Sequence, residues 1–277
     1  MFNEGYLEKI YYRFFKEENA VASVFAIHGL GGHCLWFDNA GKLFSEKKIN
    51  FFSFDLPGFG QSKYELGSIS SYKDWLDASC KVFNQFLNLF HIKSPVFIIG
   101  HSMGALIAAI ISKQINASGW ILSVPGFEGN KNVFPLSFTF KVLFRSLFKP
   151  DENIMLPFGP EQLTRNRETQ IRLKKDPHRV INLKPKMLFE VVLLTKCAIY
   201  FHGLNLKPVF MIQSGMDKVC SNQAMVRFFE KINSPDKEIK VYKDTYHDLF
   251  VEDNLPQIVD DISNWIINRA NPEIKKV

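Results

Sequence analysis

The residues best suited to chemistry surround Ser102, in the stretch Gly100-His101-Ser102-Met103-Gly104-Ala105. Glycines two positions before and two after the serine permit a sharp strand-to-helix turn, on which the hydroxyl would stand clear of the backbone. An apolar run at 95–99 predicts a buried strand before the turn, and an apolar run at 106–111 predicts a helix after it. An ordinary glycine-rich turn is the alternative, but these flanks favour a nucleophilic serine.

A serine hydroxyl is a weak nucleophile at neutral pH and needs a base within hydrogen-bonding distance. His247 is the favoured base, because it lies in the polar loop Asp244-Thr245-Tyr246-His247-Asp248-Leu249-Phe250, between the last predicted strand and the last predicted helix. A solvated surface histidine is the alternative for such a position. The other histidines fall beside the serine, in an early loop, at a helix end or in a central segment: His28, His33, His91, His101, His178 and His202.

Asp217 is the candidate for the acid that orients this base. It follows the predicted strand 208–212 closely. A carboxylate at this point would accept a hydrogen bond from one imidazole nitrogen and stabilise the imidazolium as it forms. The alternative is that Asp217 caps the helix that follows. Asp244 and Asp248 are weaker rivals for the acid, because they are so close to His247 in sequence.

Two backbone N–H groups are needed to bind the negative charge that develops on a substrate oxygen. Met103, directly after the serine, is the expected first donor. Leu30 is the expected second donor, in the loop His28-Gly29-Leu30 after an early predicted strand. His28 itself is expected to brace this loop rather than to exchange protons with a substrate.

These residues must be held by a regular framework, and the apolar pattern predicts strands that alternate with helices. Such alternation indicates βαβ units and a mainly parallel sheet with helices on both faces. The chain is therefore predicted to be an α/β protein. Predicted strands lie at 6–14, 23–27, 50–54, 95–99, 119–124, 208–212 and 238–242, and predicted helices at 36–48, 72–90, 106–111, 221–231 and 255–269.

The composition is that of an ordinary globular protein. The chain has 277 residues, of which 46% are hydrophobic and 22% charged, enough to bury a core. No apolar run reaches the length of a membrane-spanning helix, and the N-terminus lacks the pattern of a signal peptide. Four cysteines are scattered without a C-x-x-C pair, which argues against a zinc site and a disulfide framework. A cytoplasmic location is expected.

Residues 126–206 break the alternation of strands and helices. The segment contains 13 basic and 7 acidic residues, a surplus equal to the net charge of +6 of the whole chain. Its length, and its place after the predicted strand 119–124, predict a mainly helical cap over the carboxyl ends of the strands. The predicted division is a core of residues 1–125 and 207–277, with this cap inserted.

Within the segment, residues 134–149 predict a helix with a wide apolar face. Lys141, Arg145 and Lys149 recur every fourth residue, and Phe138 lies among the aromatic positions. A basic amphipathic helix suits docking to an anionic membrane and admission of an acyl chain, so these four residues are candidates for substrate binding or membrane docking. The alternative is a helix packed on the main domain with solvated cations. No nucleic-acid-binding signature accompanies the basic segment, so nucleic acid is not an expected partner.

Several stretches, taken in order, resemble the α/β-hydrolase superfamily, and within it the group of monoacylglycerol lipases, lysophospholipases and serine aminopeptidase-like proteins. The superfamily places the histidine last in the chain, which agrees with the order of serine, aspartate and histidine here. Ala105 departs from the third glycine that the group commonly has. The matching stretches are HGLGGH at 28–33, DLPGFGQS at 55–62, GHSMGA at 100–105, LTRN at 163–166, Asp176-Pro177, SGMDKVCS at 214–221 and YHDLFVE at 246–252.

The resemblance implies that Ser102 is the nucleophile, His247 the base and then the acid, and Asp217 the orienting acid, with Leu30 and Met103 as oxyanion donors. It implies hydrolysis of carboxylic esters through an acyl-enzyme, without a metal or an organic cofactor. The expected substrate is a single-chain lipid ester, such as a monoacylglycerol or a lysophospholipid. The alternatives are a hydrolase of another acyl substrate, as in an aminopeptidase or a thioesterase, and a catalytically silent binding protein.

Overall fold

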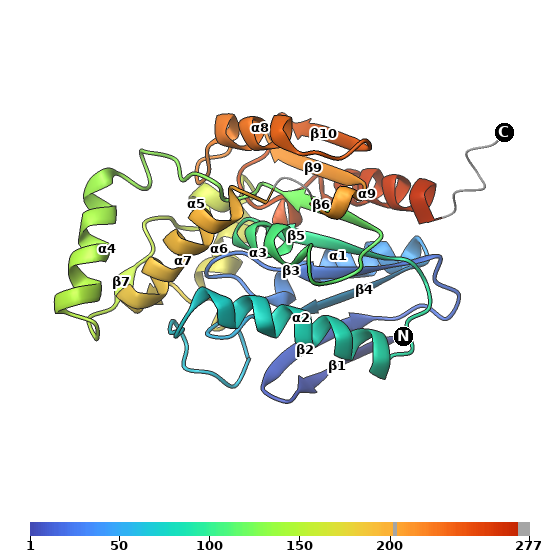
Figure 1. The fold of residues 1–277 in the computed structure, drawn as a ribbon, viewed down its shortest axis with the longest axis horizontal. Helices are drawn as coiled ribbons and strands as arrows, with labels where there is room; N and C mark the ends of the chain where they lie inside the picture. The colour runs from blue at the N-terminus through green and yellow to red at the C-terminus, as the bar shows by residue number, and fades with distance from the viewer. Residues whose placement is uncertain (202–203, 271–277) are drawn as a thin grey trace.

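The computed structural model describes residues 1–201 and 204–270, and it is organised around one large sheet (Figure 1). Within the described residues this sheet has eight strands in the order β1-β2-β4-β3-β5-β6-β9-β10. The strands β1 and β2 form an antiparallel hairpin, β2 runs antiparallel to β4, and the other pairs are parallel. The bounds are β1 (Phe2–Leu7), β2 (Ile10–Phe15), β3 (Ala22–Ile27), β4 (Ile49–Phe54), β5 (Val96–His101), β6 (Gly119–Ser123), β9 (Val209–Ser214) and β10 (Lys237–Tyr242).

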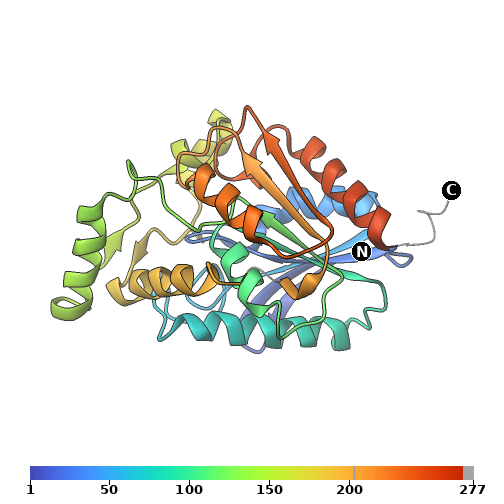
Figure 2. The same cartoon turned by 45° about the horizontal axis from the view of Figure 1, so that its top comes forward.

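Helices cover both faces of the sheet, as the alternation in the sequence predicted. One face carries α1 (Asp38–Glu46), preceded by the short 3-10 turn η1 (Cys34–Phe37), and α9 (Leu255–Ala270), which packs beside α1. The opposite face carries α2 (Tyr72–Leu89), α3 (Met103–Ile111) and α8 (Asn222–Lys231) (Figure 2). The fold is therefore an α/β fold with a mainly parallel sheet.

Every residue of the central strands β3, β4 and β5 is buried, because helices cover both faces there. The core on the α2 side is rich in aromatic rings. Phe52 lies 4.6 Å from Phe86 and 5.5 Å from Phe25 between ring centroids. The continuous apolar runs that predicted these strands are thus explained by burial on two sides, and they fix the strand ends that carry the functional loops.

The segment between residues 126 and 206 stands at one end of the sheet, where α4 lies farthest out and α7 packs between α4 and the sheet-covering helix α3 (Figure 1). Residues 202–203, which include the predicted His202, are outside the described part. The helix predicted at 134–149 spans Leu136–Phe148. The elements of the segment are α4 (Leu136–Phe148), β7 (Ile154–Met155), α5 (Pro160–Leu163), α6 (Arg167–Lys174), β8 (Asn182–Leu183), α7 (Pro185–Ala198) and the 3-10 turn η2 (Leu204–Leu206).

Asp176 anchors this segment to the rest of the protein. Its Oδ2 accepts hydrogen bonds from His33 Nε2 and from Trp36 Nε1, both at 2.8 Å. Burial opposes the charge of this carboxylate, but its interactions with His33, Trp36 and the N–H of His178 together outweigh burial and hold the pKa of Asp176 below its usual value. The motif Asp176-Pro177 therefore joins the segment to the loop after β3. Among the described residues, no helix combines the length and apolarity needed to span a bilayer.

Candidate active site

Ser102 lies at the sharp turn between β5 and α3, with φ of 53° and ψ of −113°. This left-handed conformation is strained for a residue with a side chain, and it is held by close packing around the turn. A Cβ atom at Gly100 would lie 2.5 Å from the carbonyl oxygen of Gly104, and one at Gly104 would lie 2.1 Å from the carbonyl oxygen of Ile27. Both glycines are therefore required by space, and together they aim the serine hydroxyl away from the sheet.

The three residues predicted to act together lie within hydrogen-bonding distance. The Ser102 hydroxyl donates to His247 Nε2 at 2.9 Å, and His247 Nδ1 donates to Asp217 Oδ2 at 2.8 Å. The side chains of His247 and Asp217 are 3% and 0% exposed. This chain of hydrogen bonds can draw the proton from the serine hydroxyl while the buried carboxylate stabilises the imidazolium.

The charge of Asp217 sets the proton affinity of His247. Burial disfavours the imidazolium, but the carboxylates of Asp217 and, to a smaller extent, Asp248 together outweigh burial, so the pKa of His247 is raised above its ordinary value. Asp217 Oδ1 also accepts hydrogen bonds from the backbone N–H groups of Val219 and Cys220, both at 2.8 Å. The cap of α8 is instead Ser221, whose hydroxyl accepts from Ala224 N. The carboxylate of Asp217 is thus fixed in place by its own loop.

The rival acids lie elsewhere. The Asp244 side chain is 87% exposed, on the outside of the loop. Asp248 is buried, and its Oδ2 lies 3.6 Å from His101 Nε2 rather than against His247 Nδ1. Burial raises the pKa of Asp248 to about 6. His101 is turned toward β6, where its Nδ1 lies 3.2 Å from Ser123 Oγ.

The two predicted oxyanion donors, Leu30 and Met103, border the same cavity as Ser102. Met103 is the first residue of α3, so its N–H has no acceptor within the helix. The N–H of Leu30 makes no hydrogen bond to any part of the chain that the structure describes. His28 braces this loop: its Nδ1 donates to Gly29 O at 2.8 Å, and its Nε2 accepts from Leu56 N at 2.9 Å.

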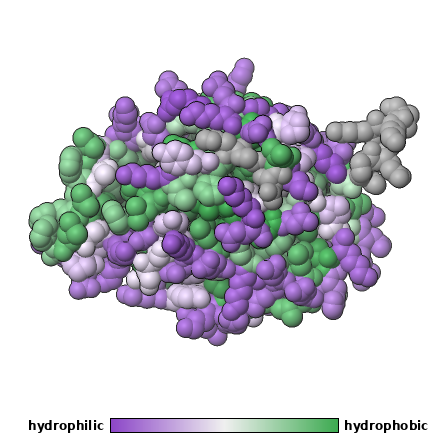
Figure 3. Space-filling model, in the orientation of Figure 1, coloured by the Kyte–Doolittle hydropathy of each residue, from purple (hydrophilic) through white to green (hydrophobic). Residues whose placement is uncertain are grey.

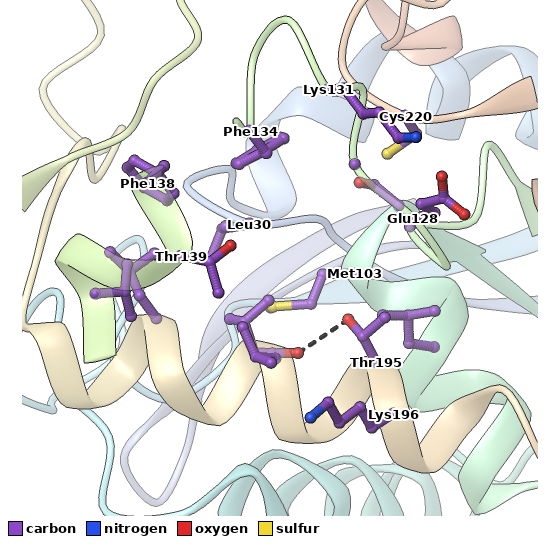
Figure 4. A pocket seen from close by; sticks show the side chains of 18 of the residues that line it. Leu30, Met103, Glu128, Lys131, Phe134, Phe138, Thr139, Thr195, Lys196 and Cys220 are labelled. Carbon is purple, nitrogen blue, oxygen red and sulfur yellow. Dashed lines mark hydrogen bonds between the residues drawn. The ribbon is translucent and has the colours of Figure 1, made fainter. Parts of the chain in front are cut away.

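A cavity of about 860 Å³ adjoins Ser102, with α4 on one side and α7 on another (Figure 4). Of the four residues expected to bind substrate or a membrane, Phe138 lines this cavity, and Lys141, Arg145 and Lys149 do not. Its surface is largely apolar, which suits a hydrocarbon chain. The lining residues are Leu30, Ser102, Met103, Leu106, Gly126, Glu128, Gly129, Lys131, Phe134, Pro135, Leu136, Phe138, Thr139, Val142, Leu188, Val191, Val192, Thr195, Lys196 and Cys220.

The α7 wall of this cavity was missed by the sequence reasoning, although a signal was present. Leu188, Val191, Val192 and Thr195 are spaced three, four and seven residues apart, which places them on one side of a helix. Cys220 is buried and borders the same cavity as Ser102, and burial raises the pKa of its thiol.

The charges of the three cations along and just after α4, Lys141, Arg145 and Lys149, are partly neutralised. Lys149 Nζ lies 2.8 Å from Glu152 Oε1, and Arg145 Nη2 lies 3.6 Å from Glu152 Oε2. The apolar face of the same helix is turned outward, so that of its residues only Val142 is buried. A band of hydrophobic surface results at this end of the molecule (Figure 3). Its exposed members on α4 are Leu136, Phe140, Leu143, Phe144, Leu147 and Phe148.

The chain is similar in sequence to a known protein family and to lipases of that kind. The profile of the family described as serine aminopeptidase, S33, matches residues 18–254. The monoglyceride lipase of Rattus norvegicus is 26% identical over 262 residues, which cover 90% of this chain and 83% of that protein. The phospholipase YtpA of Bacillus subtilis is 25% identical over 245 residues, which cover 86% of this chain and 92% of that protein.

Solved structures share the fold. The crystal structure of the Paleococcus ferrophilus monoacylglycerol lipase superposes with a TM-score of 0.81 at 20% identity, covering 94% of this chain and 99% of that one. The monoglyceride lipase of Saccharomyces cerevisiae, in complex with a substrate analog, superposes with a TM-score of 0.82 at 19% identity, covering 98% of this chain and 94% of that one.

Proposed function

The chain belongs to the serine aminopeptidase S33 family of α/β-hydrolases and is a hydrolase of the lipase and esterase type. We propose that it cleaves carboxylic esters of single-chain lipids through Ser102, His247 and Asp217. One observation carries the proposal. The chain of hydrogen bonds from Ser102 through His247 to Asp217 adjoins an apolar cavity of about 860 Å³. A volume of this size lies in the upper part of the range, about 300–1,000 Å³, that small-molecule sites occupy.

In the proposed reaction, Ser102 Oγ attacks the ester carbonyl carbon as its proton passes to His247 Nε2. The negative charge on the former carbonyl oxygen is stabilised by the N–H groups of Leu30 and Met103. His247 then returns the proton to the departing alcohol as the carbon–oxygen bond breaks, which leaves an acyl-Ser102 ester. Water, deprotonated by His247, attacks this ester, and the fatty acid is released with a free serine hydroxyl.

The composition of the cavity favours an ester over a peptide substrate. An aminopeptidase must hold the cationic amino group of its substrate, which requires an acidic pocket. Of the charged residues that line the cavity, Glu128 is paired with Arg227 at 2.9 Å, and Lys131 and Lys196 are cations. An apolar cavity with this balance of charge is better suited to an acyl chain.

We further propose that residues 126–206 form a cap inserted into a core of residues 1–125 and 207–277, and that the cap rests on an anionic membrane surface. The exposed apolar face of α4 supports the membrane contact, because a folded protein rarely leaves so many large apolar side chains together in water. Leu136 belongs to both this face and the cavity lining. An acyl chain could therefore pass from the bilayer to Ser102 beneath α4.

The catalytic part of the proposal is tested with a fluorophosphonate probe and a panel of esters. The wild-type protein should be labelled at Ser102 and should hydrolyse monoacylglycerols or lysophospholipids faster than peptide or thioester substrates. Ser102→Ala is the matched control, and it should abolish both labelling and turnover. A folded wild-type protein that is neither labelled nor active on any ester would show that the site is silent.

A further inference from the structure

Glu252 is a buried carboxylate that the proposed reaction does not use. It lies five residues after His247, and it is 6% exposed. Its Oε1 accepts a hydrogen bond of 2.6 Å from the N–H of Tyr246, the residue directly before the base. On the cap side it accepts from Arg165 N at 3.2 Å and from the Thr164 hydroxyl at 3.1 Å. One carboxylate thus joins the loop of the base to the cap.

Backbone hydrogen bonds reinforce the same junction. The N–H of Asp248 donates to Leu163 O at 2.8 Å, and the N–H of His247 points to Gln162 O at 3.5 Å. Arg165 Nη1 donates to the carbonyl oxygen of Asp244 at 3.0 Å. The loop that carries the base therefore has three successive N–H groups, those of residues 246–248, directed to the cap or to Glu252.

Burying a carboxylate is costly unless hydrogen bonds compensate it. Burial raises the pKa of Glu252, and the N–H groups of Tyr246 and Arg165 act in the opposite direction. A carboxylate kept in this position satisfies the N–H groups of Tyr246 and Arg165, which have no other acceptor among the described residues, and it limits the movement of the loop that carries His247.

We propose that Glu252, together with Thr164 of the cap, is a positioning residue for His247. This proposal rests on the proposed function. It gives the cap a second role besides selecting the substrate, because the contact between the cap and the core keeps His247 Nε2 aligned with Ser102 Oγ. A displacement of about 1 Å in a reacting group costs roughly a hundredfold in rate, so a loosened loop should lower turnover without altering substrate binding.

The test uses Glu252→Ala, Glu252→Gln and the matched control Asp253→Asn in the full-length protein, assayed with a soluble short-chain ester. Glu252→Ala should lower kcat about tenfold to a hundredfold with KM within about twofold, because the ester contacts the cavity and not this junction. Labelling by the fluorophosphonate probe should slow to a similar extent. Glu252→Gln should restore most of kcat, since its amide oxygen can accept from Tyr246 N and its amide N–H can donate to Thr164 Oγ1.

Asp253→Asn is the appropriate control because Asp253 accepts a hydrogen bond from Asn166 Nδ2 across the same cap–core junction, and within the described residues its side chain makes no hydrogen bond to the loop of His247. It should leave kcat unchanged. If Glu252→Ala does not fold, Thr164→Val serves in its place. This variant keeps the shape of the buried side chain and removes the hydroxyl, and it should lower kcat by about threefold or more, again at constant KM.

The outcomes separate the two proposals. A folded Glu252→Ala with wild-type kcat, or an equal loss of kcat in Asp253→Asn, would overturn the positioning role while Ser102→Ala still supports the proposed function. A loss of kcat in Glu252→Gln as large as in Glu252→Ala would also overturn it. A wild-type protein without esterase activity or probe labelling would overturn the proposed function, and this inference with it.

Discussion

At the scale of single residues, the protonation of His247 is decided by a competition. Burial favours the neutral imidazole, and the Asp217 carboxylate at 2.8 Å favours the imidazolium. With a further contribution from Asp248, the attraction outweighs burial, so the pKa of His247 lies above its ordinary value of 6.5. A general base acts in its neutral form, and therefore activity should fall as the pH decreases through this raised pKa.

We expect the acid limb of the kcat/KM profile to have its midpoint above pH 6.5, the ordinary value for histidine. In Asp217→Asn the attraction of Asp217 for the imidazolium is lost while burial remains, so the midpoint should move to lower pH than in the wild-type protein. The same substitution should lower kcat about 10⁴-fold, because an amide no longer stabilises the imidazolium or selects its tautomer. Asp244→Asn, at a side chain that is 87% exposed, is the control and should leave both quantities nearly unchanged. An acid limb that stays in place in Asp217→Asn would show that another group controls it.

The roles that we propose at the site could be predicted from the sequence because chemistry restricts them to few residue types. A serine between two glycines, an aspartate after a later strand and a histidine after the last strand could be recognised separately. The contacts of Cys220 and Glu252 could not, because each is defined by a neighbour far away in the chain. The thiol borders the cavity beside Ser102, and the carboxylate binds Arg165 across 87 residues.

At the scale of elements, the turn between β5 and α3 depends on missing side chains. The space next to Gly104 is occupied by the carbonyl oxygen of Ile27 on the neighbouring strand β3, which is part of the buried sheet. Backbone in that position cannot move aside without disturbing β3 and its hydrogen bonds. The packing of α3 against the sheet and the conformation of Ser102 are therefore two results of the same close approach.

Gly104→Ala should lower the free energy of unfolding by about 3 kcal/mol, the upper part of the usual range for overpacking a core. It should also reduce probe labelling of Ser102, because the turn must shift. Gly5→Ala is the matched control, since the nearest atom to its new Cβ would be a Tyr12 ring carbon at 3.5 Å, and its cost should stay below about 0.5 kcal/mol. Thermal or urea denaturation measures both. Equal stability of the two variants would show that the turn can relax around a side chain.

Most helices and strands could be predicted from the sequence, and the places where the prediction failed have physical causes. Strands buried on both faces appear as continuous apolar runs, so β3 and β4 were each placed to within about one residue at either end. The single stretch predicted at 6–14 is divided into β1 and β2 by a turn in which Glu8 has a φ of 56°. No glycine or proline marks that turn. The sequence predicted the apolar face of α4 but not whether this face points into the protein or toward solvent, because an amphipathic pattern does not identify what the apolar face contacts.

At the scale of the whole molecule, the apolar face of α4 is turned outward, and it shares Leu136 with the lining of the cavity. Phe140 and Phe144 are 63% and 55% exposed. Burying a large apolar side chain contributes about 1.5–3 kcal/mol, so two such residues can outweigh the loss of freedom on binding a surface. The cations contribute less to binding an anionic surface than their number suggests, because Arg145 and Lys149 are already paired with Glu152.

Replacing Phe140 and Phe144 by serine should weaken binding to vesicles of phosphatidylcholine and phosphatidylglycerol at least tenfold, a change of about 1.4 kcal/mol or more. Hydrolysis of vesicle-embedded substrate should decline in parallel, while kcat and KM for a soluble short-chain ester stay unchanged. The control replaces Leu89 and Val241 by serine, because these side chains are 59% and 47% exposed on other elements. Its vesicle binding should remain that of the wild-type protein. Vesicle co-sedimentation measures binding.

Charge and apolar contact can then be separated by reversing Lys141 alone. Lys141 has no hydrogen-bond or ion-pair partner in the described part of the chain, so Lys141→Glu should weaken vesicle binding more than Arg145→Glu, and the difference should vanish at high salt. The double serine variant should remain impaired at any salt concentration, because apolar burial is not screened. If the double variant binds vesicles as tightly as the Leu89 and Val241 control, the exposed face of α4 serves another contact, and the substrate must reach Ser102 by a different route.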